Sequence, residues 1–126
     1  MDQHKVILIV DDDQRNIFAL RLTLKAKGYQ VLSSTSASEA MEILEGNKGV
    51  ALILMDMMMP EMDGYETIKN IRQHEDYARL PIIAVTAKSM IGDREKCIQA
   101  GASDYISKPV DIDQLLSLLR VWLYEN

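Results

Sequence analysis

The stretch LILMDMMMPEMDG, residues 52–64, places one carboxylate, Asp56, directly after a short apolar run. The run extends back to residue 50 without a polar residue, which predicts a strand over 50–55 that is covered on both faces. The backbone of a buried strand is rigid, and Pro60 stiffens the loop that follows it. The stretch therefore predicts a carboxylate held in a fixed position at one edge of a sheet.

Short apolar runs of this kind alternate with segments of helical periodicity along the rest of the chain. Strands are predicted over residues 5–10, 29–34, 50–55, 80–86 and 103–108. Helices are predicted over residues 16–28, 36–47, 64–74, 89–101 and 111–123. Continuous hydrophobicity in the strands indicates a doubly wound α/β fold, with a parallel sheet between two helix layers. Because no linker or low-complexity segment interrupts the pattern, residues 1–126 are expected to form a single domain.

Polar residues at the predicted helix starts indicate caps. Asp13 and Asp111 are expected to cap the first and last helices. Ser36 and Glu39, which are three residues apart, are expected to form a capping box at the second helix. The residues expected on the inner face of the last helix are Leu115, Leu119 and Trp122.

The composition argues against several classes of function. The formal net charge of -5 disfavours a nucleic-acid surface, because phosphate binding needs a basic patch. No apolar run approaches the roughly 20 residues needed to span a bilayer, and the N-terminal stretch lacks the pattern of a signal peptide. The single cysteine, Cys97, cannot form an intrachain disulfide, which fits a reducing compartment. A cytoplasmic location without membrane insertion is therefore expected.

Polar side chains stand at the ends of several predicted strands. Parallel strands end at the same edge of a sheet, where ligands bind in α/β folds, so these residues are expected to lie together. They are Asp11, Asp12 and Asp13 after the first strand, Asp56 after the third, Thr86 after the fourth and Lys108 after the fifth. An aspartate after a strand is often only a helix cap, and Asp13 is interpreted in that way.

The remaining acids, the lysine and the threonine suit phosphoryl transfer. Several carboxylates within about 4–6 Å of one another disfavour joint ionisation unless a cation is present. Carboxylate oxygens are ligands for Mg²⁺, which keeps several waters and bridges to phosphate. Lys108 adds a fixed positive charge, and Thr86 adds a hydroxyl donor. The set predicts a Mg²⁺-dependent site in which Asp56 is the nucleophile.

Four stretches carry a resemblance to a known family. They are ILIVDDD (7–13), LILMDMMMPEMDG (52–64), IIAVTA (82–87) and GASDYISKP (101–109). In order and spacing they resemble the receiver domains of two-component response regulators along essentially the whole chain. The stretches DDDQRNIFAL and KPVDIDQLL further resemble receivers attached to hybrid sensor kinases. The resemblance implies a flavodoxin-like (βα)5 fold with strand order 2-1-3-4-5.

The resemblance also implies how the site works. Asp56 would accept a phosphoryl group from a phosphohistidine on a histidine kinase or a histidine phosphotransfer protein. Asp12 would bind Mg²⁺ directly and Asp11 largely through water, with Asp56 and the backbone carbonyl of Met58 as further ligands. The chain would later lose the phosphoryl group by its own hydrolysis. It would be a phosphorylated switch rather than an enzyme with turnover.

Further implied roles concern the response to phosphorylation. Thr86 and Lys108 would bind the phosphoryl oxygens, and Tyr105 would be the aromatic switch residue. The surface of the fourth helix, fifth strand and fifth helix would change and regulate a downstream effector protein or domain. The Lys108–Pro109 bond resembles one that is held cis in this family. Asn16 has no role that the sequence indicates.

A separate expectation concerns the lifetime of the phosphoryl group on Asp56. Met58 and Lys88 lie two residues beyond Asp56 and Thr86, at positions that in receiver domains flank the approach of water. An apolar Met58 cannot orient a water molecule by hydrogen bonding. Slow hydrolysis of the phosphoryl group is therefore expected.

Three alternatives stay open at this point. An aspartate-nucleophile phosphatase would need a second acid two residues after the nucleophile, where the chain has Met58. A flavodoxin-like cofactor binder would need a phosphate-cradling loop after the first strand, where the acidic DDDQRN would repel phosphate without a metal. A docking module of the same fold that is never phosphorylated would not need the complete polar set.

Overall fold

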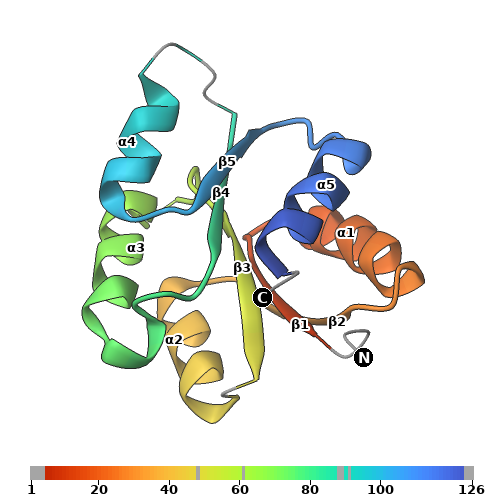
Figure 1. The fold of residues 1–126 in the computed structure, drawn as a ribbon, viewed down its shortest axis with the longest axis horizontal. Helices are drawn as coiled ribbons and strands as arrows, with labels where there is room; N and C mark the ends of the chain where they lie inside the picture. The colour runs from red at the N-terminus through yellow and green to blue at the C-terminus, as the bar shows by residue number, and fades with distance from the viewer. Residues whose placement is uncertain (1–4, 48, 61, 88–89, 91, 124–126) are drawn as a thin grey trace.

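The structure is a computed structural model that describes residues 5–47, 49–60, 62–87, 90 and 92–123. Five parallel strands form one sheet in the order β2-β1-β3-β4-β5, which confirms the expected topology (Figure 1). The strands are β1 (Val6–Val10), β2 (Gln30–Ser34), β3 (Val50–Asp56), β4 (Ile82–Thr86) and β5 (Asp104–Ser107). The helices are α1 (Gln14–Ala26), α2 (Ala37–Gly46), α3 (Gly64–Gln73), the short 3₁₀ helix η1 (Glu75–Tyr77), α4 (Asp93–Ala100) and α5 (Ile112–Leu123).

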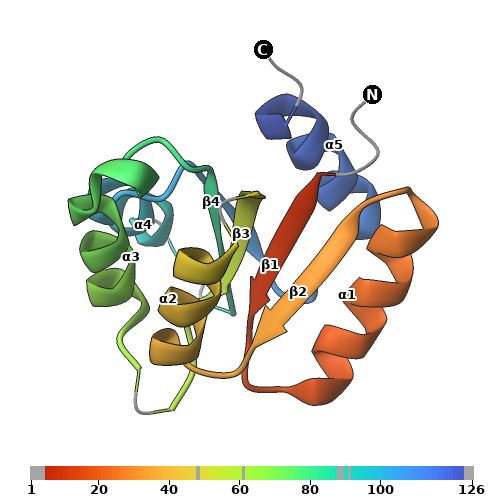
Figure 2. The same ribbon diagram turned by 90° about the horizontal axis from the view of Figure 1, so that it is seen from below.

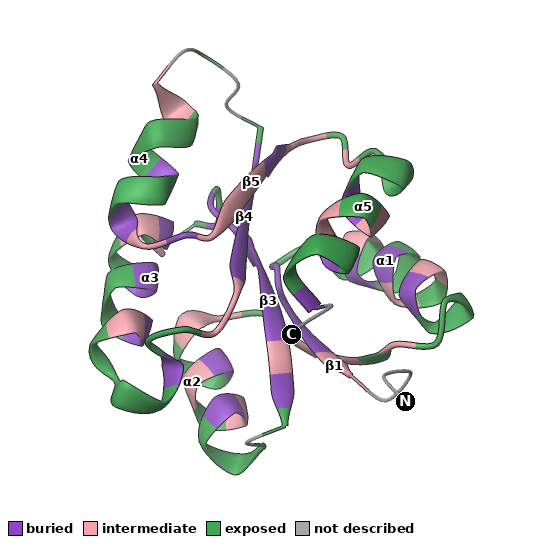
Figure 3. Ribbon diagram, in the orientation of Figure 1, coloured by how far each residue is buried: buried purple, intermediate pink, exposed green. Residues whose placement is uncertain are grey.

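Helices cover both faces of the sheet. Helices α1 and α5 lie on one face, and α2, α3 and α4 lie on the other (Figure 1, Figure 2). Successive strand residues point to opposite faces, so Ile7 and Ile9 of β1 join the core under α1 and α5. Leu8 and Val10 join the second core, under α2, α3 and α4. Figure 3 shows the strands largely buried between helices whose outer surfaces are exposed.

The expected caps of α1, α2 and α5 are confirmed. The side chains of Asp13 and Asp111 each accept a hydrogen bond from a backbone N–H of the helix that follows, at 2.9 and 3.1 Å. Ser36 Oγ accepts from the backbone N–H of Glu39 at 3.1 Å. The carboxylate of Glu39 accepts from the N–H of Thr35, so the capping box closes one residue earlier than in the usual pattern.

The start of α4 differs from the prediction. The helix begins at Asp93 rather than at residue 89, because Gly92 adopts a left-handed φ of 100° directly before it. The predicted start, Ser89, lies outside the described residues. Strand β4 begins at Ile82, after Pro81, which has no N–H to donate to the sheet.

The inner face of α5 also differs from the prediction. Trp122 is 37% exposed, and its Nε1 donates to Asp104 Oδ2 at 3.1 Å. Leu123 takes the inner position instead, because residues four apart share a helix face and Leu115 and Leu119 precede it. None of the helices in the described residues combines the length and the apolar composition that a bilayer span needs.

One arginine joins the segments that precede β4 and β5. Arg72, near the end of α3, donates from Nη1 to the carbonyls of Tyr77 and Leu80, at 2.8 and 2.6 Å. Its Nε donates to the carbonyl of Gly101 at 2.8 Å, and its Nη2 donates to Ser103 Oγ at 3.3 Å. The guanidinium therefore holds α3 against the amino-end edge of the sheet, the edge at which the parallel strands begin.

Candidate functional site

The carboxyl-end edge, at which the parallel strands end, gathers residues from three neighbouring strands. Val10 of β1 is paired with Met55 of β3, and Asp56 of β3 is paired with Val85 of β4. Asp11 follows Val10 and therefore stands beside the end of β3. Strand order and register thus bring together residues that are far apart in the sequence, at the edge where α/β sheets bind ligands.

Three carboxylates meet at this edge. Asp11, Asp12 and Asp56 each offer one oxygen, and these oxygens lie within 4.8 Å of one another. Asp11 and Asp56 are buried, each 3% exposed, whereas Asp12 is exposed. Mutual repulsion disfavours this arrangement unless a positive charge is near, and hard oxygen donors open to solvent on one side suit Mg²⁺. The donor set therefore fits a divalent cation.

The two carboxylate oxygens of Asp56 have different partners. Oδ1 accepts from the backbone N–H of Met58 at 3.0 Å, and Oδ2 lies 3.3 Å from Nζ of Lys108. Burial raises the pKa of Asp56, and the nearby charge of Asp11 raises it further. The hydrogen bond from Met58 and the charge of Lys108 only partly oppose this shift. Ionised Asp56 is therefore an under-compensated buried charge.

Lys108 is anchored at the end of β4. Its backbone N–H donates to the carbonyl of Thr86 at 2.8 Å, and the Lys108–Pro109 peptide bond is cis, as the resemblance implied. Thr86 is buried at the last position of β4, next to Val85, whose carbonyl accepts from the N–H of Met57 at 2.8 Å. These bonds fix the lysine, the threonine and the loop after Asp56 to one strand end.

The first residues after Asp56 pack closely against the start of α3. The side chains of Met57 and Met59 are buried, whereas Met58 is 46% exposed. A Cβ on Gly64 would lie 2.8 Å from Met57 Sδ and 3.0 Å from Met57 Cα. Gly64 is therefore required by the close approach of the loop to the start of α3.

Tyr105, the expected switch residue, lies on β5 opposite Ala84 of β4. Its ring is partly buried against the core under α2, α3 and α4. Burial raises the pKa of the Tyr105 phenol, with Asp93 and Cys97 contributing. The second position assigned to control of hydrolysis, Lys88, lies outside the described residues.

Sequence reasoning missed one polar contact to the acids. Asn16 Nδ2 donates to Asp11 Oδ2 at 2.7 Å. The signal was an amide three residues after the cap Asp13, where the first turn of α1 brings it back toward the end of β1. A single asparagine in a polar helix start does not stand out in one sequence.

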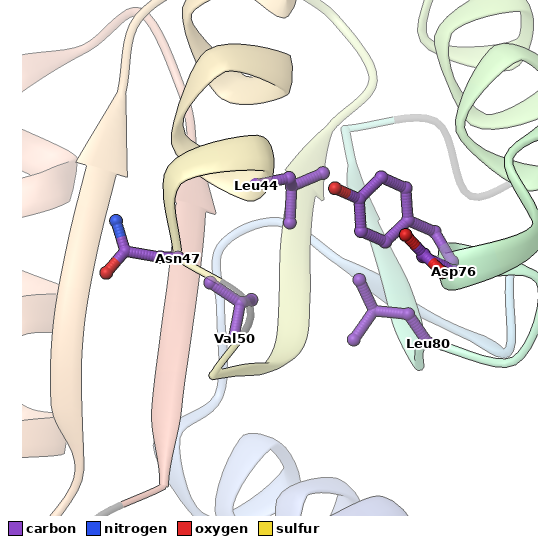
Figure 4. Close-up of a pocket in the computed structure, with 6 residues that line it drawn as sticks. Leu44, Asn47, Val50, Asp76 and Leu80 are labelled. Atoms are coloured by element: carbon purple, nitrogen blue, oxygen red, sulfur yellow. The ribbon is translucent and has the colours of Figure 1, made fainter.

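Two hollows lie at opposite ends of the sheet. A pocket of about 630 Å³ near the acids is lined by Asn16, Ala19, Leu20, Thr23, Lys108, Pro109, Val110 and Ile112. The other, of about 430 Å³, is lined by Leu44, Asn47, Val50, Asp76, Tyr77 and Leu80 (Figure 4). Of these two pockets, only the first is lined by a predicted site residue, Lys108.

Known proteins share both the sequence pattern and the fold. A family model described as the response regulator receiver domain matches residues 7–120. The chain is 34% identical to the polar-differentiation response regulator DivK of Brucella ovis, over 94% of this chain and 96% of that protein. It is similar to a solved receiver domain of a sensor histidine kinase from Pseudomonas aeruginosa, with 37% identity, a TM-score of 0.85 and coverage of 95% and 98%. A response regulator receiver protein from Pseudomonas putida gives 32% identity, a TM-score of 0.86 and coverage of 94% and 97%.

Proposed function

Because this chain belongs to the family of response regulator receiver domains of two-component signalling, we propose that it is a phosphoacceptor switch whose acceptor is Asp56. The observation that carries the proposal is the surroundings of Asp56. It is buried, lies 3.3 Å from Lys108 and shares a cluster with Asp11 and Asp12. We further propose that residues 1–126 form one receiver domain.

The proposed reaction exchanges one bond to phosphorus for another. A carboxylate oxygen of Asp56 attacks the phosphorus of a phosphohistidine on a histidine kinase or a histidine phosphotransfer protein. The P–N bond breaks, the imidazole keeps its electron pair and takes a proton from solvent, and an acyl phosphate forms on Asp56. Attack of water on phosphorus later restores the carboxylate and releases inorganic phosphate, so each molecule is modified and reset rather than turning over substrate.

The residues around Asp56 prepare this transfer. Asp11, Asp12, Asp56 and the backbone carbonyl of Met58 would hold Mg²⁺, which when bound neutralises charge on the transferring phosphoryl group. The solved receiver from Pseudomonas aeruginosa is described with magnesium coordinated in its active-site cleft, which supports this choice of metal. Lys108 supplies a positive charge to a phosphoryl oxygen, and the N–H of Met58 keeps the Asp56 carboxylate in place.

The proposed response to phosphorylation is a change in the conformation of one surface of the domain. A phosphoryl group adds roughly two negative charges and three acceptor oxygens. Thr86 would donate its hydroxyl to one of these oxygens, and the ring of Tyr105 would turn into the space beside Thr86. The surface of α4, β5 and α5 would change with it and regulate a downstream effector protein or domain. Both conformers would exist before phosphorylation, which shifts their populations.

An NMR titration tests the switch and separates it from a docking module that is never phosphorylated. Backbone amide spectra are recorded with Mg²⁺ alone and then with Mg²⁺ and acetyl phosphate. The proposal expects new shifts at Thr86 and Tyr105 and along α4, β5 and α5, which fade as the phosphoryl group is hydrolysed. Spectra of a folded protein that do not respond to acetyl phosphate would favour the docking module.

A further inference from the structure

The side-chain amide of Asn16 makes a contact that the proposed reaction leaves unused. Asn16 lies in the first turn of α1, and its Nδ2 is 2.7 Å from Asp11 Oδ2. An ionised carboxylate can only accept hydrogen bonds, so the amide presents its NH₂ group to Asp11. Asn16 therefore acts on a member of the acid cluster without supplying an oxygen to it.

Asp11 is held from two sides. Its Oδ1 accepts from the backbone N–H of Asp13 at 2.9 Å, and its Oδ2 accepts from Asn16. Its own backbone N–H donates to the carbonyl of Ser34 at 3.0 Å. Each carboxylate oxygen has about two acceptor sites, so each retains one for water or a cation. The two donors fix the plane of the Asp11 carboxylate. They leave one acceptor site on each oxygen for a water or a cation shared with Asp12.

The helix that carries Asn16 is itself firmly placed. Ile17 and Leu20, on the inner face of α1, are 2% and 6% exposed. The cap at Asp13 fixes the first turn through its hydrogen bond to the N–H of Arg15. A side chain on such an anchored turn can hold its partner in one orientation, as functional sites require.

We propose that Asn16 is a positioning residue for the cation site, where it fixes the carboxylate of Asp11 without adding positive charge. The inference rests on the proposed function, since it takes the acid cluster to hold a divalent cation. A lysine or arginine at this position could donate to Asp11, but its charge would compete with the cation. The neutral amide orients the acid and leaves the negative charge of the cluster available.

The test is cation binding to the full chain, with Mn²⁺ as a paramagnetic probe and Mg²⁺ as its competitor. Asn16→Leu keeps the size of the side chain and removes the donor. Thr23→Val is the matched control, because Thr23 also lies on α1 and lines the same pocket as Asn16. We expect Asn16→Leu to weaken Mn²⁺ binding about tenfold, the lower end of the range for groups that orient metal ligands. Thr23→Val should bind as the parent does, and Asn16→Gln, which keeps an amide, should recover part of the affinity.

Thermal unfolding without divalent cations separates positioning from a structural role. A structural role would lower the unfolding midpoint of Asn16→Leu and leave the Mn²⁺ affinity of its folded form unchanged, which would overturn the inference. An equal loss of affinity in Thr23→Val would overturn it as well. A parent that binds Mn²⁺ and is phosphorylated on Asp56, with Asn16→Leu equal to it in affinity, overturns this inference alone. A parent that binds neither Mn²⁺ nor Mg²⁺ overturns both the inference and the metal part of the proposed function.

Discussion

The two edges of the sheet give their charged side chains different sets of partners. At the amino-end edge, the guanidinium of Arg72 donates to three backbone carbonyls and to Ser103, and burial lowers the pKa of Arg72. At the carboxyl-end edge, Asp56 has one backbone N–H and one ammonium, but Asp11 lies nearby and burial raises the pKa of Asp56. The first charge is satisfied by the fold, whereas the second still favours an added cation.

This difference separates a structural charge from a responsive one. A buried charge with all its partners in place stabilises one arrangement of the chain and gains little from a ligand. A charge with incomplete compensation costs stability in the free protein and regains it when a ligand binds. Removing the charge at the amino-end edge is therefore expected to change mainly stability, whereas removing the charge at the carboxyl-end edge is expected to change metal and phosphoryl binding.

The largest effect on stability is expected from Arg72→Met. The variant leaves three backbone carbonyls without their donor, so we expect the free energy of unfolding to fall by about 3 kcal/mol. Lys69→Met on the same helix is the control, since Lys69 is exposed and should change stability by no more than about 0.5 kcal/mol. Urea unfolding of both variants measures this. Equal effects of the two substitutions would show that Arg72 does not hold the amino-end edge.

A smaller loss of stability is expected from Gly64→Ala, at the carboxyl-end edge. The new Cβ would press on the side chain and Cα of Met57, and such overpacking costs about 1–2 kcal/mol. Gly46→Ala is the matched control in α2, where nothing lies within 4 Å and the substitution should stabilise by about 0.5 kcal/mol. Opposite signs in chemical unfolding are expected. A stabilising Gly64→Ala would mean that the loop after Asp56 is loosely packed.

The pH dependence of stability tests the uncompensated charge directly. Because the pKa of Asp56 is raised above its usual 3.8, the folded chain keeps a proton that the unfolded chain has released. The contribution of this carboxyl group to the free energy of unfolding is fully present below its unfolded pKa. It is lost as the pH rises through its folded pKa. Asp56→Asn carries no such proton, so the variant should gain stability relative to the parent as pH rises from about 4 to 7 without divalent cations.

Unfolding curves of the parent and Asp56→Asn at several pH values provide the comparison. Added Mg²⁺ should stabilise the parent more than the variant, because a cation compensates the charge that the variant lacks. A difference in stability between the two proteins that stays constant with pH would contradict the uncompensated state of Asp56.

The smallest effect is expected at Met58, whose side chain is 46% exposed two residues beyond the acceptor. Met58→Asn introduces a group that can hydrogen-bond to an attacking water. One such bond is worth about 0.5–1.5 kcal/mol, which corresponds to roughly two- to tenfold faster hydrolysis. The decay of phosphorylated protein, followed by mass spectrometry, measures this rate. A longer lifetime in Met58→Asn would show that hydrolysis is not limited by the orientation of water.

Much of this architecture follows from local patterns in the sequence. The apolar run before Asp56 and those before Asp11 and Thr86 predict buried parallel strands, and parallel strands must end at one edge. Lys108 could be placed at the same edge for the same reason. The chemical roles of these residues stay proposals, because proximity alone does not establish phosphorylation.

Other features depend on contacts that no local pattern carries. The hydrogen bond from Arg72 to Gly101 joins residues 29 positions apart, so helical periodicity does not reveal it. The apolar ring of Trp122 suggested an inner position, but its indole N–H donates a hydrogen bond to Asp104 at the surface. Asn16 went unassigned because its partner depends on how α1 is set against β1.

The most direct test of the central claim is intact-mass and peptide mass spectrometry after incubation with Mg²⁺ and acetyl phosphate. The account predicts one added phosphoryl group on Asp56, absent from Asp56→Ala and from samples without Mg²⁺. Arg72→Met, kept at a temperature where it stays folded, should be labelled at the same residue as the parent. Labelling on another residue, or none in the folded parent, would contradict the assignment of the carboxyl-end edge as a phosphoryl acceptor.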